Sequence, residues 1–542
     1  MLTDPLHHTP RRLTSHDGTA AQARDDGAAH WLVMTSAVPG AFCLVLHSHL
    51  PWLPGHGVWP LGEEWLFQAW AESYVPLVAE LDSLAAEGHR DVLTLGVTPV
   101  LAAQLDHPRM RAETATWVGL WEQRARELGF DRDGTRRDAA QREYAAARHC
   151  AALLESRWSA GGSPVLRGLR DDGVVELLGG PAAHPILPLL QPEFVATALG
   201  AGLDDALWRL GERPAGTWLP ECAWAPHLAG DLASAGVRHF LVDEQTVRDA
   251  GGHPHGAWRV RGTDLVAVPR DLDVTNLVWS SRTGYPAAAA YRDFHAREEF
   301  TGTRLWAITA PDVGVGSKRA YDPEAARAQV ARDVEHFVGA VRGRLESVAE
   351  ATAAPGLVVA AYDTELFGHW WHEGPAFLGA AVRALRDAGV RVTTVARALD
   401  DGLVAGDLDL GPGSWGAGKD FSVWAGRQVR DIAHENEWLQ RRWLDLTARE
   451  RAAGRLGVRR PDLDQLLTTL FHALSSDWAF LVTRGQSVDY ARRRAEGHRR
   501  DFHGLAQLVE DGRRDEAREE AARLALRDGA FPALDARTHL AG

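Results

Sequence analysis

Glu221 and Asp363 are the carboxyl-bearing residues best placed to do chemistry, because each follows an apolar run and has aromatic neighbours. The run before Asp363, residues 357–361, has the length of a buried strand. Two carboxyl groups that face one pocket are the minimum apparatus for cleaving a glycosidic bond: one attacks or stabilises the sugar cation, and the other protonates the leaving oxygen. A carboxyl group in apolar, aromatic surroundings has a raised pKa, which suits the proton donor.

Histidines follow two further apolar runs. His47 and His49 come after residues 41–46, and His184 comes shortly after residues 174–178. Polar side chains at the ends of several strands indicate one shared pocket. The stretch after Asp363 is also denser in polar and aromatic groups than a single helix cap requires. It contains Glu365, His369, Trp370, Trp371, His372 and Glu373. Of these, Glu365, His369 and Glu373 either orient Asp363 or cap the helix that follows.

The elements that must position these groups are strands alternating with helices. The expected strands are residues 41–46, 92–97, 174–178, 217–219, 239–243, 265–268, 305–308, 357–361 and 391–395. Helical patterns cover about residues 64–85 and 323–350, and a charged helical insertion covers about 109–165. A polar loop is expected over 244–257. This alternation predicts a parallel α/β barrel, with the functional groups at the C-terminal ends of its strands.

The pattern changes along the chain in a way that predicts three parts. Residues 1–40 are largely polar and are expected to be a disordered extension. Residues 41–405 form the barrel. Residues 406–542 begin with a glycine-rich loop and then show only helical periodicity, which predicts an α-helical C-terminal domain. Its expected helices are residues 429–453, 462–480, 487–511 and 515–527.

Composition narrows the class of protein. The 542 residues carry a formal net charge of −14, which argues against nucleic acid or an anionic membrane as the main partner. Three widely spaced cysteines without a CxxC pattern indicate reduced thiols and a cytoplasmic protein. No apolar run reaches the length of a membrane helix. Many of the 21 tryptophans fall in loops after strands, where an indole face can meet a sugar ring.

Five ordered motifs resemble those of glycoside hydrolase family 57. They are His47-Ser48-His49, residues 176–184, Trp218-Leu219-Pro220-Glu221, residues 362–371, and Ser475-Ser476-Asp477-Trp478. Within that family, the long fourth motif and the loop Trp415-Gly416-Ala417-Gly418 resemble the α-1,4-glucan branching enzymes most. The resemblance runs from about Ala41 to beyond Asp477.

The resemblance implies a (β/α)7 incomplete barrel with inserted helices and a helical C-terminal domain. It implies a retaining enzyme that cuts an α-1,4-glucan, such as amylose or a glycogen-like chain, and passes the donor to a 6-hydroxyl. Neither a metal nor an organic cofactor is expected. By motif position, Glu221 is similar to the nucleophile and Asp363 to the general acid/base. The implied substrate-binding residues are His47, His49, His184 and Asp477, with Trp59, Trp279, Trp415 and Trp424 as aromatic walls.

One departure from the family concerns the loop after the fifth strand. Branching enzymes of this family carry a tyrosine near the tip of that loop, which shields the glycosyl-enzyme from water. Here the corresponding residues 242–258 form a short stretch without tyrosine. Because transfer requires water to be kept out, an α-amylase or a 4-α-glucanotransferase of the same family is the main alternative. Oligomeric state does not follow from the sequence.

Other readings of the same residues stay open. The pair His47 and His49 also begins binuclear metal hydrolases, but that class wants a lysine at a strand end, and neither Lys318 nor Lys419 ends an expected strand. A non-catalytic glucan-binding protein would keep the tryptophans without needing both carboxyls. Cys222 with His227 suggests a thiol enzyme, provided that the two side chains meet in space. Trp415 and Trp424 could instead attach the helical domain to the barrel.

Overall fold

A single sheet organises the molecule, and the computed structural model describes it within residues 38–540, except residues 60, 132, 281 and 311–312. The extension predicted for residues 1–40 therefore lies outside the described residues up to position 37. Nine strands of the described part form the sheet in the order β8-β1-β2-β3-β4-β5-β7-β6-β9. They are β1 Gly40–Ser48, β2 Leu93–Val97, β3 Val175–Gly179, β4 Gly216–Thr217, β5 His239–Val242, β6 Ala257–Val260, β7 Val266–Pro269, β8 Gly356–Asp363 and β9 Val404–Leu408.

Seven of these strands make an open barrel. From β8 through β1 to β5 and β7, every neighbouring pair is parallel. β6 then pairs antiparallel with β7 and carries β9 at the outer edge. Between the two ends of the seven, the backbone N–H of Asp271 donates to the carbonyl of Val359 at 2.7 Å. The incomplete seven-stranded barrel predicted from the sequence is confirmed.

The strands form because their apolar runs are buried on both faces, as parallel strands require. On β1, Ala41, Cys43 and Val45 pack inside the barrel with the alternate β8 residues Leu357, Val359 and Ala361. The residues between them on both strands pack outward against helices. This period of two fixes which side chain at the end of each strand faces the barrel interior.

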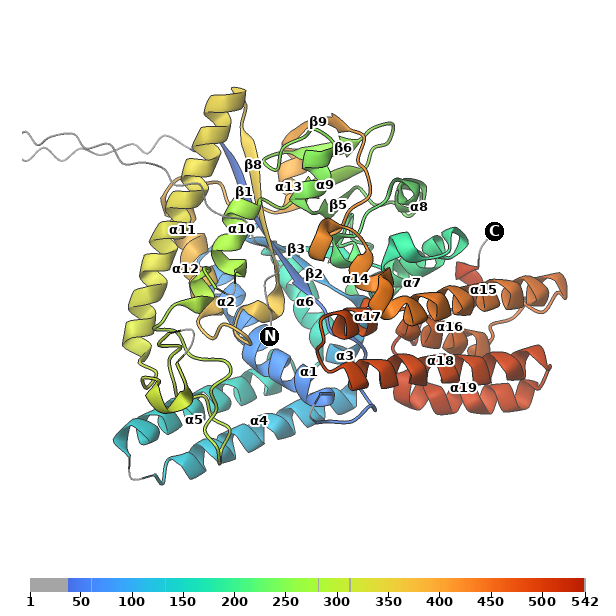
Figure 1. The fold of residues 1–542 in the computed structure, drawn as a ribbon, viewed down its shortest axis with the longest axis horizontal. Helices are drawn as coiled ribbons and strands as arrows, with labels where there is room; N and C mark the ends of the chain where they lie inside the picture. Colours follow the sequence, from blue (N-terminus) through green and yellow to red (C-terminus); the bar gives the residue numbers. More distant parts are fainter. Residues whose placement is uncertain (1–37, 60, 132, 281, 311–312, 541–542) are drawn as a thin grey trace, which may run out of the picture.

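Helices surround the barrel. They are α1 Glu63–Ala69, α2 Val75–Ala86, α3 Pro99–Asp106, α4 Pro108–Leu128, α5 Gly134–Glu155, α6 Gly162–Asp171, α7 Pro192–Leu210, α8 Ala229–Ser234, α9 Glu244–Asp249, α10 Leu272–Trp279, α11 Pro323–Thr352, α12 Gly374–Asp387 and α13 Val395–Asp400. A π-helical turn, Trp70–Tyr74, joins α1 to α2. α4 and α5 form the predicted helical insertion and project as a hairpin at one corner of the molecule (Figure 1).

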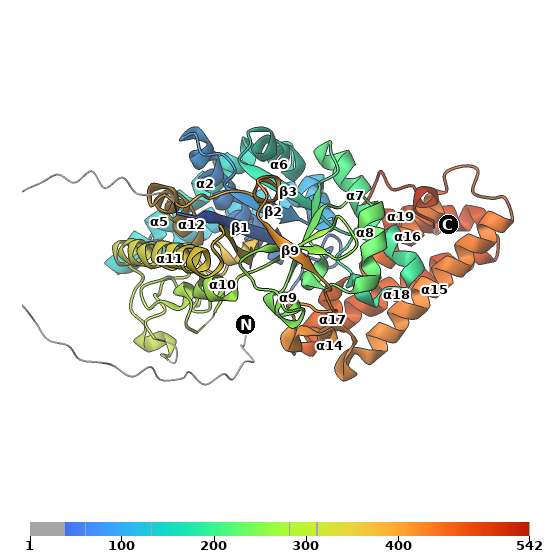
Figure 2. The ribbon, with the colours of Figure 1, turned by 90° about the horizontal axis from the view of Figure 1, so that it is seen from above.

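The C-terminal region is helical, as predicted, from Ser422 onward; the predicted start at 406 falls inside β9, which still belongs to the sheet. It contains α14 Ser422–Ala425, α15 Arg430–Ala452, α16 Pro461–Ala473, α17 Ser476–Thr483, α18 Val488–Glu510 and α19 Arg514–Asp528. Both views place α15, α16, α18 and α19 together at the opposite end of the molecule from α11 (Figures 1 and 2). Leucines of α16 pack with Phe502 and Leu505 of α18 and Leu524 of α19 in one apolar core. Among the described helices, none has the length and apolar character to cross a bilayer.

Four predicted elements differ from the structure. The strand expected over 305–308 is wrong: only single-residue bridges occur there, and Thr309, at φ 68°, ends the extended run. In 391–395 only Val392 pairs, with Phe42, and α13 begins at Val395. The loop expected over 244–257 starts with α9, because the Asp243 side chain caps it through the amide of Gln245. The helix expected over 462–480 is two helices, α16 and α17, separated at Ser475, whose backbone is extended.

Candidate active site

His47 and Asp363 are register partners on the adjacent strands β1 and β8. Each continues the alternate series whose earlier members, ending at Val45 and Ala361, pack inside the barrel. Both side chains therefore project from the C-terminal end of the barrel toward its interior. A strand pairing that is made by apolar residues thus fixes the position of two polar ones.

Glu221 comes from the turn after β4 and has a left-handed backbone, with φ 59° and ψ 25°. This conformation costs free energy for a residue with a side chain and is typical of functional sites. Two backbone hydrogen bonds hold the turn: Cys222 N–H donates to Leu219 at 2.8 Å, and Trp415 N–H donates to the Glu221 carbonyl at 2.9 Å. The indole N–H of Trp415 also donates to Glu221 Oε2 at 2.6 Å.

The surroundings of the two carboxyls raise their pKa values toward neutral pH. Burial raises the pKa of Glu221 to about 7, opposed by the Trp415 hydrogen bond and assisted by the negative charge of Asp363. Burial and the charge of Glu365 raise the pKa of Asp363 to about 8, opposed by Arg270. Asp363 therefore keeps its proton to a higher pH than Glu221 does. This difference suits Glu221 as the nucleophile and Asp363 as the proton donor.

Glu365 is the third buried carboxyl of the site. It accepts a short hydrogen bond from the hydroxyl of Tyr74 on the π-helical turn, and burial raises its pKa to about 7. Its charge acts on Asp363 directly. Of the two roles left open for Glu365, the geometry supports an influence on Asp363, because its carboxylate is bonded to Tyr74 and not to the amides at the start of α12.

The three predicted histidines and Asp477 come together. His47 Nε2 lies 3.0 Å from His184 Nε2, and the rings of His49 and His184 stack with centroids 3.8 Å apart. His49 also contacts Asp477 of α17, with 2.9 Å between Nε2 and Oδ2. Burial lowers the pKa of both His47 and His184 well below the usual range. Neutral imidazoles that can donate and accept hydrogen bonds are suited to reading sugar hydroxyls.

The predicted tryptophans divide into two groups. Trp415 lies beside Glu221, and its ring centroid is 5.9 Å from that of the half-buried Trp279. Trp59 is 77 % exposed and lines a separate open cleft with residues of α18. Trp424 is only 3 % exposed and packs with Val482 and Ala491 of the C-terminal helices. Its ring is therefore covered by protein. This agrees with the alternative prediction that Trp424 is a packing residue and not a wall for the glucan.

Sequence reasoning missed a buried charge cluster behind Trp415. Asp243, which is fully buried, accepts hydrogen bonds from Arg270 at 2.7 and 3.1 Å and from Lys419 at 2.9 Å. The guanidinium of Arg270 lies 5.0 Å from the centre of the Trp415 ring. Asp243 and Arg270 directly follow β5 and β7, so the only signal in the sequence was a charged residue at a strand end. Trp218, whose ring centroid stacks 4.4 Å from that of His47, belongs to the third motif but was given no role from the sequence.

The structure separates the two residues that a thiol enzyme would need, Cys222 and His227. Cys222 is 1 % exposed, and burial raises the pKa of its thiol above the usual range. His227 is exposed on the outside of the chain. A base on the surface cannot activate a buried thiol, because general-base activation needs direct hydrogen-bond contact.

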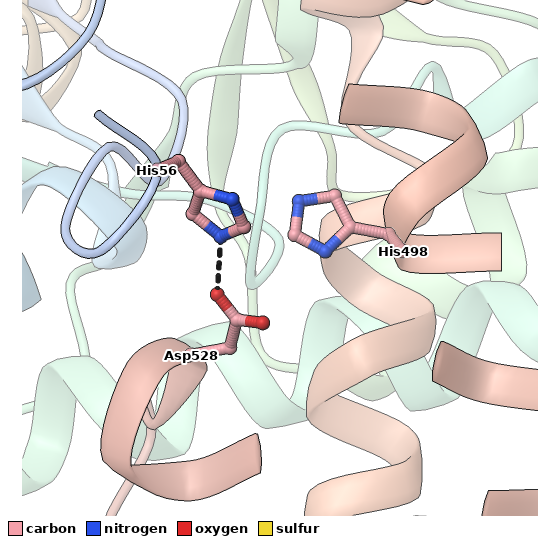
Figure 3. A group of neighbouring side chains, drawn as sticks. All are labelled: His56, His498 and Asp528. Atoms are coloured by element: carbon pink, nitrogen blue, oxygen red, sulfur yellow. Dashed lines mark hydrogen bonds and ion pairs between the residues drawn. The ribbon is translucent and has the colours of Figure 1, made fainter. Parts of the chain in front are cut away.

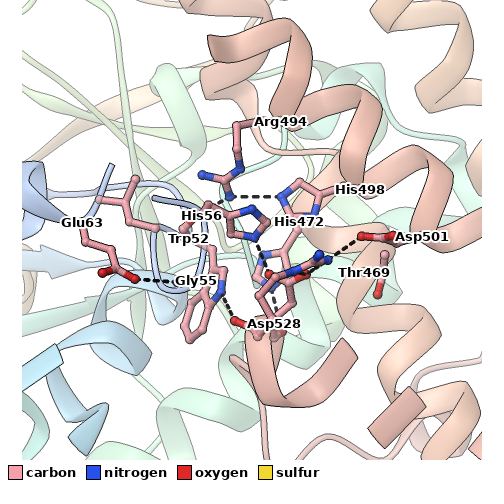
Figure 4. A network of polar contacts seen from close by, with 12 residues as sticks. Trp52, Gly55, His56, Glu63, Thr469, His472, Arg494, His498, Asp501 and Asp528 are labelled. Carbon is pink, nitrogen blue, oxygen red and sulfur yellow. Dashed lines mark hydrogen bonds and ion pairs between the residues drawn. The ribbon is translucent and has the colours of Figure 1, made fainter. Parts of the chain in front are cut away.

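His56, His498 and Asp528 form the one His/Asp group in the described part of the chain with ligand atoms close enough for a metal ion (Figure 3). Asp528 Oδ1 already lies 2.6 Å from His56 Nε2, and Arg527 binds the other oxygen, Oδ2. Arg494 Nη2 donates to His498 Nε2 at 3.1 Å (Figure 4). Since guanidiniums only donate, the donor set here is already engaged by cations and does not fit a metal. The pair His47 and His49 instead contacts His184, Thr98 and Asp477.

Comparisons with known proteins agree over most of the chain. Residues 43–404 match Glycosyl hydrolase family 57, and residues 435–539 match the family described as 1,4-alpha-glucan branching enzyme, C-terminal. A probable 1,4-alpha-glucan branching enzyme of Mycobacterium tuberculosis is 44% identical over 526 residues, covering 93% of this chain and 98% of the relative.

Solved structures give the same result. The GH57-type branching enzyme of Pyrococcus horikoshii superimposes with a TM-score of 0.86 at 30% identity, covering 92% of this chain and 97% of that one. The α-amylase AmyC of Thermotoga maritima superimposes with a TM-score of 0.82 at 25% identity, covering 93% and 99%. The chain belongs to glycosyl hydrolase family 57.

Proposed function

We propose that this chain is a 1,4-alpha-glucan branching enzyme, which cleaves an α-1,4-glucan and transfers the donor segment to a 6-hydroxyl to make an α-1,6 branch. The observation that carries the proposal is the 44% identity to a probable branching enzyme over nearly the full length of both chains. The match of residues 435–539 to the branching-enzyme C-terminal family supports it independently of the catalytic segment.

The proposed reaction assigns one role to each carboxyl. Glu221 attacks the anomeric carbon and forms a glycosyl ester, while Asp363 protonates the leaving 4-oxygen. Asp363 then accepts the proton of an incoming 6-hydroxyl, whose oxygen attacks the anomeric carbon, displaces the Glu221 carboxylate and restores the original anomeric configuration. The pKa values of about 7 for Glu221 and about 8 for Asp363 support this assignment, because a pH between them leaves the nucleophile ionised and the acid protonated.

The sugar beside the cleaved bond is proposed to lie against the histidines and Asp477. Their ring and carboxylate atoms converge from β1, the segment after β3, and α17. Trp279 and Trp415 supply indole faces next to Glu221 for the pyranose rings of an α-1,4-glucan. Neither role requires a nucleic acid or a membrane as partner. A cytoplasmic location is supported by the three buried, free cysteines.

A hydrolase is the second candidate function. The similarity to the α-amylase of Thermotoga maritima, at a TM-score of 0.82, favours it. So does the segment 242–258, which contains the short helix α9 but no tyrosine to cover the intermediate. If water reaches the ester on Glu221 as easily as a 6-hydroxyl does, hydrolysis competes with transfer.

One experiment distinguishes the branching enzyme from the hydrolase. The protein is incubated with amylose, and new α-1,6 linkages and new reducing ends are measured in the same reaction. Branching creates an α-1,6 linkage for each α-1,4 bond cleaved and leaves the number of reducing ends unchanged. The expected result is therefore many branches with few reducing ends. Reducing ends without branches would replace the proposal by the hydrolase. The absence of both signals would contradict either activity on this substrate.

A further inference from the structure

An open cleft of about 700 Å³ lies between the loop that carries His56 and Trp59 and the N-terminal half of α18. Its volume is in the range of sites for small molecules. The residues that matter for its chemistry are Trp59, Tyr490, Arg493, Arg494, Arg500 and Arg527. We call it the arginine cleft. It is lined by none of the carboxyl, histidine or tryptophan residues assembled around Glu221.

The arginine cleft is positive on a protein whose net charge is −14. Four arginines line it against two aspartates, Asp489 and Asp501, and Asp501 is already paired with Arg527. In the part of the chain that the structure describes, no carboxylate lies within ion-pair distance of Arg493, Arg494 or Arg500. The neighbouring arginines of α18, Arg492 and Arg499, point to carboxylates of α15 instead.

Arg494 is the buried cation of the arginine cleft, and no carboxylate is paired with it. It is 5 % exposed, and its guanidinium lies 4.7 Å from the centre of the Trp478 ring. Its Nη1 donates to the Tyr490 hydroxyl at 2.7 Å. Its Nη2 contacts His498 and the carbonyl of Trp52 (Figure 4). Its Nε has no hydrogen-bond partner. Asp528 favours the charge of Arg494 without forming an ion pair with it. A buried cation without a paired carboxylate is costly unless an anion completes it.

Trp59 adds a second requirement on the ligand. Its side chain is 77 % exposed at the edge of the cleft, so a flat face is open to a ring. Arginine forks match the geometry of phosphate oxygens better than that of a neutral hydroxyl. A neutral glucan could use the indole, but it would leave the excess of guanidinium charge uncompensated.

We propose that the arginine cleft binds an organic phosphate, with the phosphoryl group held by Arg494, Arg493 and Arg500 and the attached ring placed against Trp59. The ring can belong to a phosphorylated sugar or to a nucleotide, which share this chemistry. The proposal adds a ligand site to the chain and is independent of branching, because none of the three arginines contacts Glu221 or Asp363 in the described structure.

Isothermal titration calorimetry of the full chain tests the proposal with glucose 1-phosphate, ADP, inorganic phosphate and neutral maltoheptaose as separate probes. We expect one organic phosphate per chain to bind, more tightly than inorganic phosphate and more weakly as salt is raised. Preference for glucose 1-phosphate or for ADP identifies the source of the ring. Titrations that show binding of maltoheptaose only, or of no phosphate compound at all, would overturn the proposal.

Variants locate the site. The double change Arg493→Gln with Arg500→Gln lies on the surface and should weaken organic phosphate binding by about tenfold or more. Arg492→Gln, on the same helix but paired with Asp431, is the matched control and should not change the dissociation constant. Glu221→Gln should bind the phosphate unchanged. Equal weakening in Arg492→Gln, or loss of binding in Glu221→Gln, would place the ligand elsewhere and refute the assignment.

Discussion

Trp415 holds Glu221 at two points: its indole N–H donates to the carboxylate at 2.6 Å, and its backbone N–H donates to the Glu221 carbonyl at 2.9 Å. The indole is in turn covered by the Arg270 guanidinium, which Asp243 anchors. A residue expected as a wall for the glucan, or as a link between the barrel and the helical domain, therefore also orients the proposed nucleophile. A hydrogen bond to a carboxylate stabilises its charged form, so Trp415 works against the burial that raises the Glu221 pKa.

Replacing Trp415 by Phe should move the acid limb of the pH–rate profile. The ring stays, but the hydrogen bond to Glu221 is lost, so the pKa of Glu221 rises further and the limb shifts to higher pH by about one unit. The profile of kcat/KM against pH measures this. Trp279→Phe is the control, since Trp279 packs against Trp415 without bonding to Glu221. An acid limb that stays in place in Trp415→Phe would show that the hydrogen bond does not control the ionisation of Glu221.

The unmodified enzyme should show a narrow bell-shaped pH dependence. Activity requires Glu221 ionised, which happens as pH rises through about 7, and Asp363 protonated, which is lost as pH rises through about 8. The maximum should therefore lie between these values. Because the two carboxyls interact, the limbs report apparent pKa values of the pair. Initial branching rates from pH 5 to 10 test the expectation, and a rate that keeps rising above pH 9 would contradict Asp363 as the acid.

Much of this site could be predicted from the sequence because its residues directly follow strands that a local apolar pattern reveals. His47, His49 and Asp363 directly follow apolar runs that are recognisable as buried strands, and parallel strands bring their C-terminal ends together. Asp477 was found only through the resemblance of its motif. Its contact with His49 joins residues that are 428 positions apart, and nothing in the periodicity of α17 indicates it.

What could not be predicted depends on packing between distant segments. The cluster of Asp243, Arg270 and Lys419 is assembled from three separate strand ends or loops, each of which looks like an ordinary surface charge in the sequence. The burial of Trp424 follows from how α14 docks on α17, which no local pattern specifies. The run at 305–308 is apolar enough for a strand, but it found no long partner in the sheet.

Glu221→Gln and Asp363→Asn should both lower kcat strongly, and Glu221→Gln by more. Removing the nucleophile should lower kcat by on the order of 10⁴ or more. Removing the general acid/base should cost about 10²–10⁴. Glucan binding should persist in both, since neither change removes the histidines or the tryptophans. Asp409→Asn, an exposed carboxyl paired with Arg261, is the control and should keep full activity. Full activity of Asp363→Asn on amylose would disprove the proposed mechanism.

Asp477→Asn should lower kcat/KM by about 10–100-fold, through misplacement of His49. Although burial opposes it, the charge and hydrogen bond of His49 keep the pKa of Asp477 below its usual value, so the pair is a charge-assisted contact. The amide retains the size but not the charge. Circular dichroism and the melting temperature should change little, and the exposed Asp445→Asn on α15 serves as control. If Asp477→Asn keeps the original kcat/KM, the contact between α17 and β1 has only a structural role.

Asp363→Asn should also stabilise the fold, by an amount that grows as pH rises from about 4 to about 8. The pKa of Asp363 rises from 3.8 to about 8 on folding, so the folded state binds the proton more tightly than the unfolded state. The stability that this protonated carboxyl contributes is present below pH 4 and is lost as pH rises through about 8. A neutral amide does not suffer this loss, so the free energy of unfolding of Asp363→Asn should exceed that of the unmodified chain by up to about 5 kcal/mol at pH 9, and by only about 1–2 kcal/mol at pH 5. Urea unfolding at pH 5 and pH 9 measures the difference, with Asp409→Asn as the exposed control. A difference of the same size at both pH values would mean that the charge of Asp363 is not the source of the instability.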